Sequence, residues 1–117
     1  VERFCTASAD RTARIVDGLE AQGEPLPFLL AILTNQIRSL IKLRASFETS
    51  GNLYVKGVFA TNAMKAAARR IPLKRLAAAL DVCADIDRLS KGLSVSERDG
   101  DPWIELKSVC LFLARTR

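Results

Sequence analysis

The segment from Gly23 to Arg44, GEPLPFLLAILTNQIRSLIKLR, constrains the fold more than any other part of this 117-residue chain. Two prolines stand at its start, where a helix loses nothing by their missing N–H groups. Apolar residues then recur at spacings of three and four, which is the period of a helix with one buried face: Leu26, Leu29, Leu30, Leu33, Ile37, Leu40 and Ile41. Phe28 and Ile32 lie beside that face. The segment predicts a helix from Pro25 to about Phe47 that is covered on most sides. A single small bundle cannot cover such a helix on so many sides.

The remaining segments predict further helices joined by short loops. A first helix ends at Gly23 and a later one at Gly92, because glycine readily adopts the left-handed conformation that terminates a helix. We expect these helices over residues 10–22, 61–71, 72–91 and from 102 onward. The fold class is therefore all-α, a single bundle of five to six helices with antiparallel neighbours.

Helix starts are marked by capping residues. Asp10 is the expected N-cap of the first helix, either Thr61 or Asn62 caps the short one, and Asp101 caps the last, with Pro102 in its first position.

Trp103 is in register with the apolar residues Leu106, Cys110 and Leu113 of the last helix. We expect it to be mostly buried against the helix that begins at Pro72, so that replacing it with alanine costs about 3–5 kcal/mol.

The stretch from Glu48 to Gly57, ETSGNLYVKG, follows no helical pattern. Turn residues precede a short apolar group, Leu53, Tyr54 and Val55. A short strand fits this group, although no partner strand is evident.

Composition is that of an ordinary globular domain, with 49% hydrophobic and 26% charged residues. The longest apolar run is shorter than the ~20 residues of a membrane span, so no membrane partner is expected. No signal peptide is evident. Since the chain begins with Val1 rather than methionine, we interpret it as a piece of a longer protein.

The sequence offers little catalytic or metal-binding chemistry. It contains no histidine, and its three cysteines, Cys5, Cys83 and Cys110, are far apart, which favours buried thiols in a reducing cytoplasm over a zinc site. No glycine-rich phosphate loop occurs, and the SERDGD stretch, residues 96–101, is interpreted as a loop and helix cap rather than a calcium site. We therefore expect no catalytic residue, no metal and no cofactor.

Three acids, Asp81, Asp85 and Asp87, lie close together on one predicted helix. Asp85 precedes Arg88 by three residues and Asp87 precedes Lys91 by four, which predicts ion pairs along the surface of the helix.

Basic residues are concentrated in the middle of the chain. The stretch from Arg38 to Arg75 holds nine of the 18 basic residues and one of the 13 acidic ones. Four of the nine are candidate nucleic-acid contacts: Arg69, Arg70, Lys74 and Arg75. The alternative is that they occupy exposed faces and the C-terminal turn of a helix. No aromatic residue alternates with them, so base stacking is not expected there.

Four segments, in their order and spacing, resemble the C-terminal domain of the delta subunit of the bacterial DNA polymerase III clamp loader: DGLEAQGEPLPFLL, AILTNQIRSLIKLR, AAARRIPLKRLAAALDVCADIDRLSKGL and DPWIELKSVCLFLA. The resemblance extends from about Asp10 to Ala114, and residues 48–57 depart from it most. It rests chiefly on EP before the long helix and DPW at the start of the last one.

The resemblance implies that residues 1–9 end a preceding lid domain and that residues 10–117 form a helical collar domain. Such a domain is not an enzyme; it joins the other clamp-loader subunits, which would also cover part of the helix starting at Pro25. The sliding clamp is gripped by an N-terminal region outside this chain, DNA contact is expected only in the full complex, and the location is the bacterial cytoplasm. The alternative is a free-standing, basic, helical nucleic-acid-binding domain.

Overall fold

Five α-helices make up the fold in the part of the chain that the computed structural model describes, which is residues 9–58, 60–93 and 101–115. They are α2 (Ala9–Ala21), α3 (Leu26–Ser50), α4 (Asn62–Arg70), α5 (Leu73–Ser90) and α6 (Pro102–Arg115). No strand occurs in these ranges, so the all-α prediction is confirmed for them.

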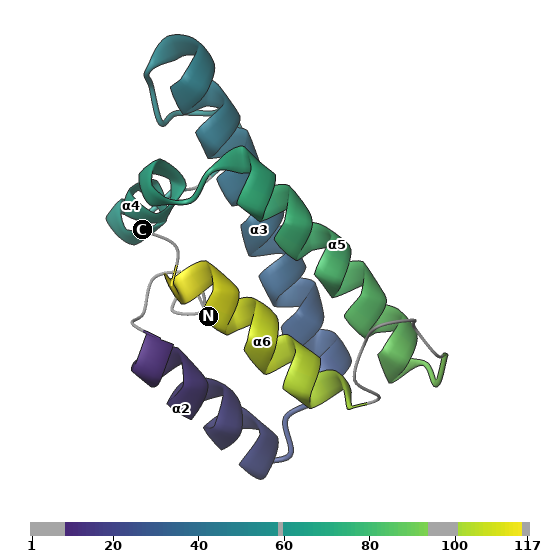
Figure 1. The fold of residues 1–117 in the computed structure, drawn as a ribbon. Helices are drawn as coiled ribbons and strands as arrows, with labels where there is room; N and C mark the ends of the chain where they lie inside the picture. The colour runs from purple at the N-terminus through teal and green to yellow at the C-terminus, as the bar shows by residue number, and fades with distance from the viewer. Residues whose placement is uncertain (1–8, 59, 94–100, 116–117) are drawn as a thin grey trace.

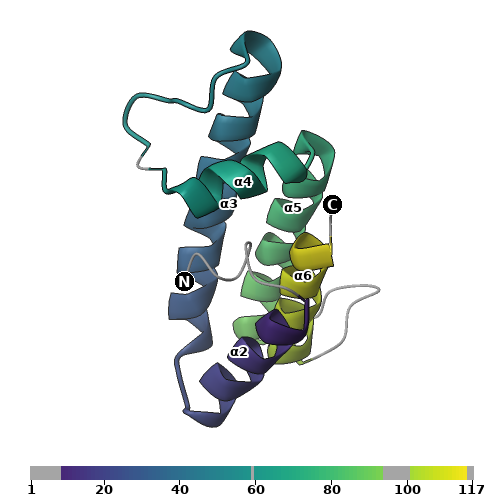
Figure 2. The same ribbon diagram turned by 90° about the vertical axis from the view of Figure 1, so that its left-hand side faces the viewer.

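The helices form an elongated antiparallel bundle. α5 packs against both α3 and α6, and α2 packs on the side of α6 away from α5 (Figure 1). The short helix α4 crosses α3 and leads directly into α5 (Figure 2). The C-terminal end of α3 projects beyond the other helices, and the molecule measures 42 × 27 × 25 Å along its principal axes.

Local capping chemistry explains where the helices begin. The Thr61 hydroxyl accepts a hydrogen bond from the Met64 N–H at 3.2 Å, and the Asp101 carboxylate accepts one from the Trp103 N–H at 2.9 Å. Both satisfy N–H groups that lack a partner within the helix. The predictions that Asp101 caps the last helix and that Thr61 or Asn62 caps the short one are confirmed, with Thr61 in that role.

Two predicted boundaries were wrong. The described part of α2 begins at Ala9, so Asp10 lies in the first turn and not at the N-cap. α3 continues beyond Phe47 to Ser50, where Gly51 ends it with a left-handed φ of 76° and donates a hydrogen bond to the Phe47 carbonyl at 2.9 Å. Residues 51–57 then form irregular structure, so the suggested short strand is absent.

The core is built mainly from leucine and isoleucine on the inner faces of α3, α5 and α6. Its largest fully buried side chains are Val16, Leu33, Ile37, Leu40, Leu43, Ile71, Leu76, Ile86, Leu106 and Leu113. Cys83 and Cys110 are also buried, as expected, whereas Cys5 lies outside the described residues.

One burial prediction is confirmed and another needs correction. The bundle buries the predicted face of the first turns of α3, including Leu26, Leu29 and Leu30, and it leaves Phe28 mostly exposed. Trp103 stands in the first turn of α6, where it packs against the core but is only partly buried.

α3 is also the one helix of the described chain whose length and mean hydropathy, 1.2, would permit it to cross a membrane. The core helix of a soluble protein satisfies the same criteria, and α3 packs against both α4 and α5 in the bundle.

Candidate interaction surfaces

Arg44 is one of the basic residues of the middle stretch, and it has a structural role. Its Nη1 donates hydrogen bonds to the carbonyls of Arg69, at 2.7 Å, and Ala68, at 3.3 Å, while its Nε pairs with Glu48 at 2.9 Å. The two carbonyls belong to the last turn of α4, where backbone acceptors lack helical partners. Arg44 therefore fastens the end of α4 to α3.

Arg70 makes the same kind of contact with α6. Its Nη1 donates to the carbonyls of Leu113, at 3.0 Å, and Ala114, at 3.3 Å, near the C-terminal end of that helix. A guanidinium at this position also interacts favourably with the negative end of the helix dipole. Of the four candidate nucleic-acid contacts, Arg70 is thus one whose side chain hydrogen-bonds to another part of the fold. This contact could not be predicted from local sequence patterns, because Arg70 and Leu113 are more than forty residues apart.

Arg69, Lys74 and Arg75 are exposed at the corner where α4 ends and α5 begins. The first turn of α5 contains no acid, and Pro72 at its N-cap provides no side-chain cap. Two cations therefore stand at the positive end of a helix dipole, which favours anions. The Arg75 guanidinium also lies over the Phe112 ring, 5.3 Å from its centroid. The segment around Arg75 contains no aromatic residue, but α6 places one next to this cation.

The acidic residues of α5 behave largely as predicted. Asp85 accepts a hydrogen bond from Arg88 at 3.2 Å, and Asp87 pairs with Lys91 at 2.8 Å. Across the described residues, no group of three or more histidine, cysteine or acidic side chains is arranged to hold a metal ion.

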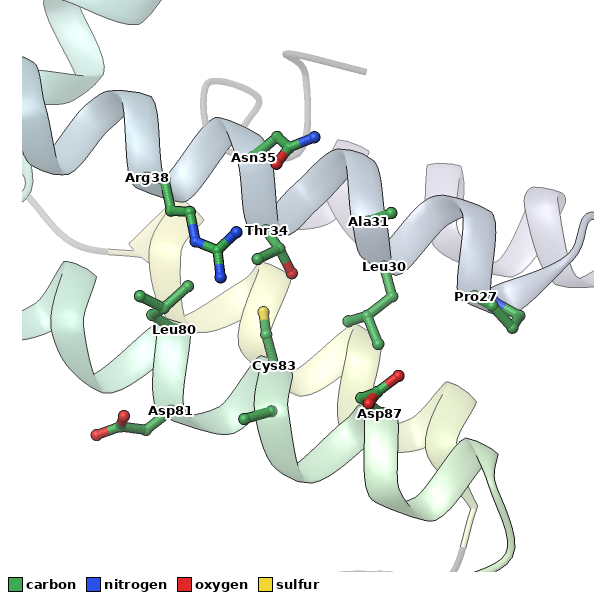
Figure 3. A pocket seen from close by; sticks show the side chains of 11 residues that line it. Pro27, Leu30, Ala31, Thr34, Asn35, Arg38, Leu80, Asp81, Cys83 and Asp87 are labelled. Atoms are coloured by element: carbon green, nitrogen blue, oxygen red, sulfur yellow. The ribbon is translucent and has the colours of Figure 1, made fainter.

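A groove of about 450 Å³ lies between α3 and α5 (Figure 3). Leu30 and Leu80 contribute its apolar lining, and Arg38 extends over it from α3. Thr34 and Cys83 point toward each other across it. Burial raises the pKa of the Cys83 thiol to about 11, an effect that its hydrogen bond with Thr34 partly offsets. At neutral pH this thiol is therefore protonated and a poor nucleophile.

Exposed apolar side chains are the other notable surface feature. The large ones are Phe28, Tyr54, Leu93, Ile104 and Phe112. The start of α3, the end of α5 and the start of α6 share one end of the bundle (Figure 1), so three of the five, Phe28, Leu93 and Ile104, belong to that end. Tyr54 belongs to the loop at the opposite end of α3.

Comparisons of the chain with protein-family models, with curated proteins and with solved structures found no match.

Proposed function

We propose that this chain is the non-catalytic collar domain of a clamp-loader delta subunit, which joins the other subunits of the complex that loads the sliding clamp onto primed DNA. The observation that carries the proposal is the correspondence between the resembling segments and the helices. The EP and DPW motifs stand at the starts of α3 and α6, and the AAARRIP segment forms the junction of α4 and α5.

Exposed apolar surface supports an assembly role. Phe28 is 59% exposed and Leu93 is 56% exposed, and both belong to the same end of the bundle. Apolar side chains that would be left in water by an isolated domain are typical of surfaces that bind another protein. In this proposal neighbouring subunits cover that end, residues 1–9 end the preceding lid domain, and the protein works in the bacterial cytoplasm.

Mixing the chain with the other purified clamp-loader subunits and following co-elution tests the proposal. We expect the wild-type chain to co-elute and Phe28→Asp to weaken assembly at least ~10-fold, as loss of a central apolar contact does. Tyr54→Asp is the matched control, because Tyr54 is 75% exposed at the opposite end and its replacement should leave assembly intact. Failure of the wild-type chain to join the complex would overturn the proposal.

The alternative, a nucleic-acid-binding domain, is favoured by one observation, the exposed cations Lys74 and Arg75 in the first turn of α5, which contains no acid. We expect this corner to bind duplex or primed DNA no more tightly than the ~10⁻⁴–10⁻⁶ M typical of non-specific contact at physiological salt. Arg69 could add to the weak contacts of other subunits in the full complex.

A titration of labelled primed DNA at two salt concentrations separates the two functions. The double variant Lys74→Gln, Arg75→Gln is compared with Arg38→Gln, Lys42→Gln, which removes the same charge from exposed positions on α3. Tight, sequence-dependent binding that survives high salt and is lost only in the first double variant would favour the nucleic-acid-binding domain over the collar.

A further inference from the structure

The outward side of α6 carries a row of residues that another helix could cover. Ile104 is 49% exposed, Phe112 is 37% exposed, and the exposed Ser108 lies midway between them. A spacing of four places these residues along one side of a helix. The small Ser108 at the centre permits close approach, and the large apolar residues on either side provide contact area.

A groove of about 310 Å³ between α5 and α6 adjoins this row and continues the apolar surface onto α5. Its lining residues are Ala78, Val82, Glu105, Ser108, Val109 and Phe112. We call the groove together with Ile104 the α5–α6 face. The two helices are antiparallel (Figure 1), and the contact between Arg75 and Phe112 fixes their register. Arg75 therefore belongs to the end of the face where α6 finishes, and Asp85, three turns further along α5, belongs to the end where α6 starts.

We infer that two copies of this chain associate through the α5–α6 face, about a two-fold axis that passes beside Ser108, with their α6 helices antiparallel. Ile104 and Phe112 are equally far from Ser108 along the helix. The symmetry consequently places Phe112 of each copy beside Ile104 of the other and brings the two Ser108 side chains together at the axis.

Charge complementarity identifies a second copy as the occupant. The same antiparallel arrangement sets the cation Arg75 of one copy opposite the carboxylate Asp85 of the other, and this pair occurs twice. A two-fold axis parallel to the helices would instead keep α6 against α6 but put the two α5 helices on opposite sides of that pair, which would separate Arg75 from Asp85 of the other copy. Asp85 keeps its bond to Arg88 on the same helix, and the second cation adds to that bond. The inference rests on this face alone and holds whether or not the chain belongs to a clamp loader.

Sedimentation of the full chain over a range of concentrations provides the first test. We expect a concentration-dependent dimer, and we expect Phe112→Asp to raise its Kd at least ~10-fold because it places a charge in a desolvated contact. Phe28→Asp is the control, since Phe28 is exposed outside the α5–α6 face. A chain that stays monomeric throughout, or a dimer weakened as much by Phe28→Asp, would overturn the inference.

Cross-linking at the axis provides the second test. In a Cys5→Ser background the remaining cysteines, Cys83 and Cys110, are buried. We expect Ser108→Cys to form a disulfide between copies under mild oxidation, whereas Ala31→Cys, exposed beside the α3–α5 groove, should not. Equal cross-linking of the two variants would contradict the predicted axis.

A charge reversal tests the orientation. Arg75→Glu should weaken the dimer by placing two carboxylates opposite each other, and the double variant Arg75→Glu, Asp85→Arg should regain part of the loss. If the double variant dimerises no better than Arg75→Glu, the antiparallel pairing is wrong.

Discussion

Arg70 stabilises the fold, and replacing it with glutamine should destabilise the domain measurably. One Nη1 group serves both the Leu113 and the Ala114 carbonyls, at 3.0 and 3.3 Å, so the pair counts as about one hydrogen bond. A hydrogen bond to a charged group contributes about 1.5–3 kcal/mol. Because Arg70 is only half-buried, solvent competes for its donors and the lower part of that range applies. The favourable interaction with the dipole of α6 adds about 0.3–1 kcal/mol. We therefore expect Arg70→Gln to lower the free energy of unfolding by about 2–3 kcal/mol.

Arg69→Gln is a closely matched control for this prediction. Arg69 is adjacent in sequence, lies in the same last turn of α4 and carries the same charge, so both variants lose the same interaction with the dipole of α4. Its side chain is exposed, and the carbonyl that Arg44 bonds remains in place. An exposed substitution of this kind is expected to change stability by less than about 0.5 kcal/mol.

Urea denaturation followed by far-UV circular dichroism measures both variants, with hydrogen exchange of the last turn of α6 as a local readout. Arg70→Gln should lower the midpoint without changing the slope and should speed exchange at the end of α6. Equal stability of the two variants would refute the stabilising contact between Arg70 and the end of α6. Arg70 would then be a surface cation like Arg69.

Three further measurements test the structure. Trp103→Ala should cost about 1–3 kcal/mol in urea denaturation, less than a fully buried tryptophan, because Trp103 is only partly covered; a cost of about 3–5 kcal/mol would contradict its position at the edge of the core. Thr61→Ala should cost about 0.5–2 kcal/mol through loss of the bond to the Met64 N–H, and Asn62→Ala much less; a larger cost for Asn62→Ala than for Thr61→Ala would assign the cap to Asn62. Burial raises the folded pKa of Cys83 from 9.0 to about 11, so the unfolded chain ionises first and stability should fall as pH rises from about 9 towards 11. Cys83→Ala should remove that part of the pH dependence, and an unchanged pH profile in this variant would contradict the raised pKa.

The features that sequence predicted well are those decided within a few residues. Asp101 caps α6 through a bond spanning two residues, and the ion pairs of Asp85 and Asp87 span three and four. The helical period also identified most of the core, because a stripe of leucines has no other stable place in a small domain. The end of α3 was harder to predict, because Thr49 and Ser50 bond back to carbonyls of the preceding turn and the helix continues to the next glycine.

The candidate surfaces could not be predicted in this way, because they depend on which helices become neighbours. Arg44 and Arg70 look like the other basic residues of the middle stretch, yet each reaches the end of a helix that is distant in sequence. Phe112 likewise comes to lie beneath Arg75 only when α6 packs on α5.

The divided roles of the basic residues bear on both proposals. The Arg70 side chain hydrogen-bonds to the end of α6, and the Arg75 guanidinium lies over Phe112. Fewer of the four candidate cations are therefore directed only to solvent than the sequence predicted. A smaller group of phosphate contacts lowers both the affinity for DNA and its dependence on salt. The apolar residues Ile104, Phe28 and Leu93 are about half exposed or more. Burying apolar area drives protein association, whereas a few exposed cations contribute weakly at physiological salt. The balance of exposed surface thus supports the proposal of protein partners rather than the nucleic-acid alternative.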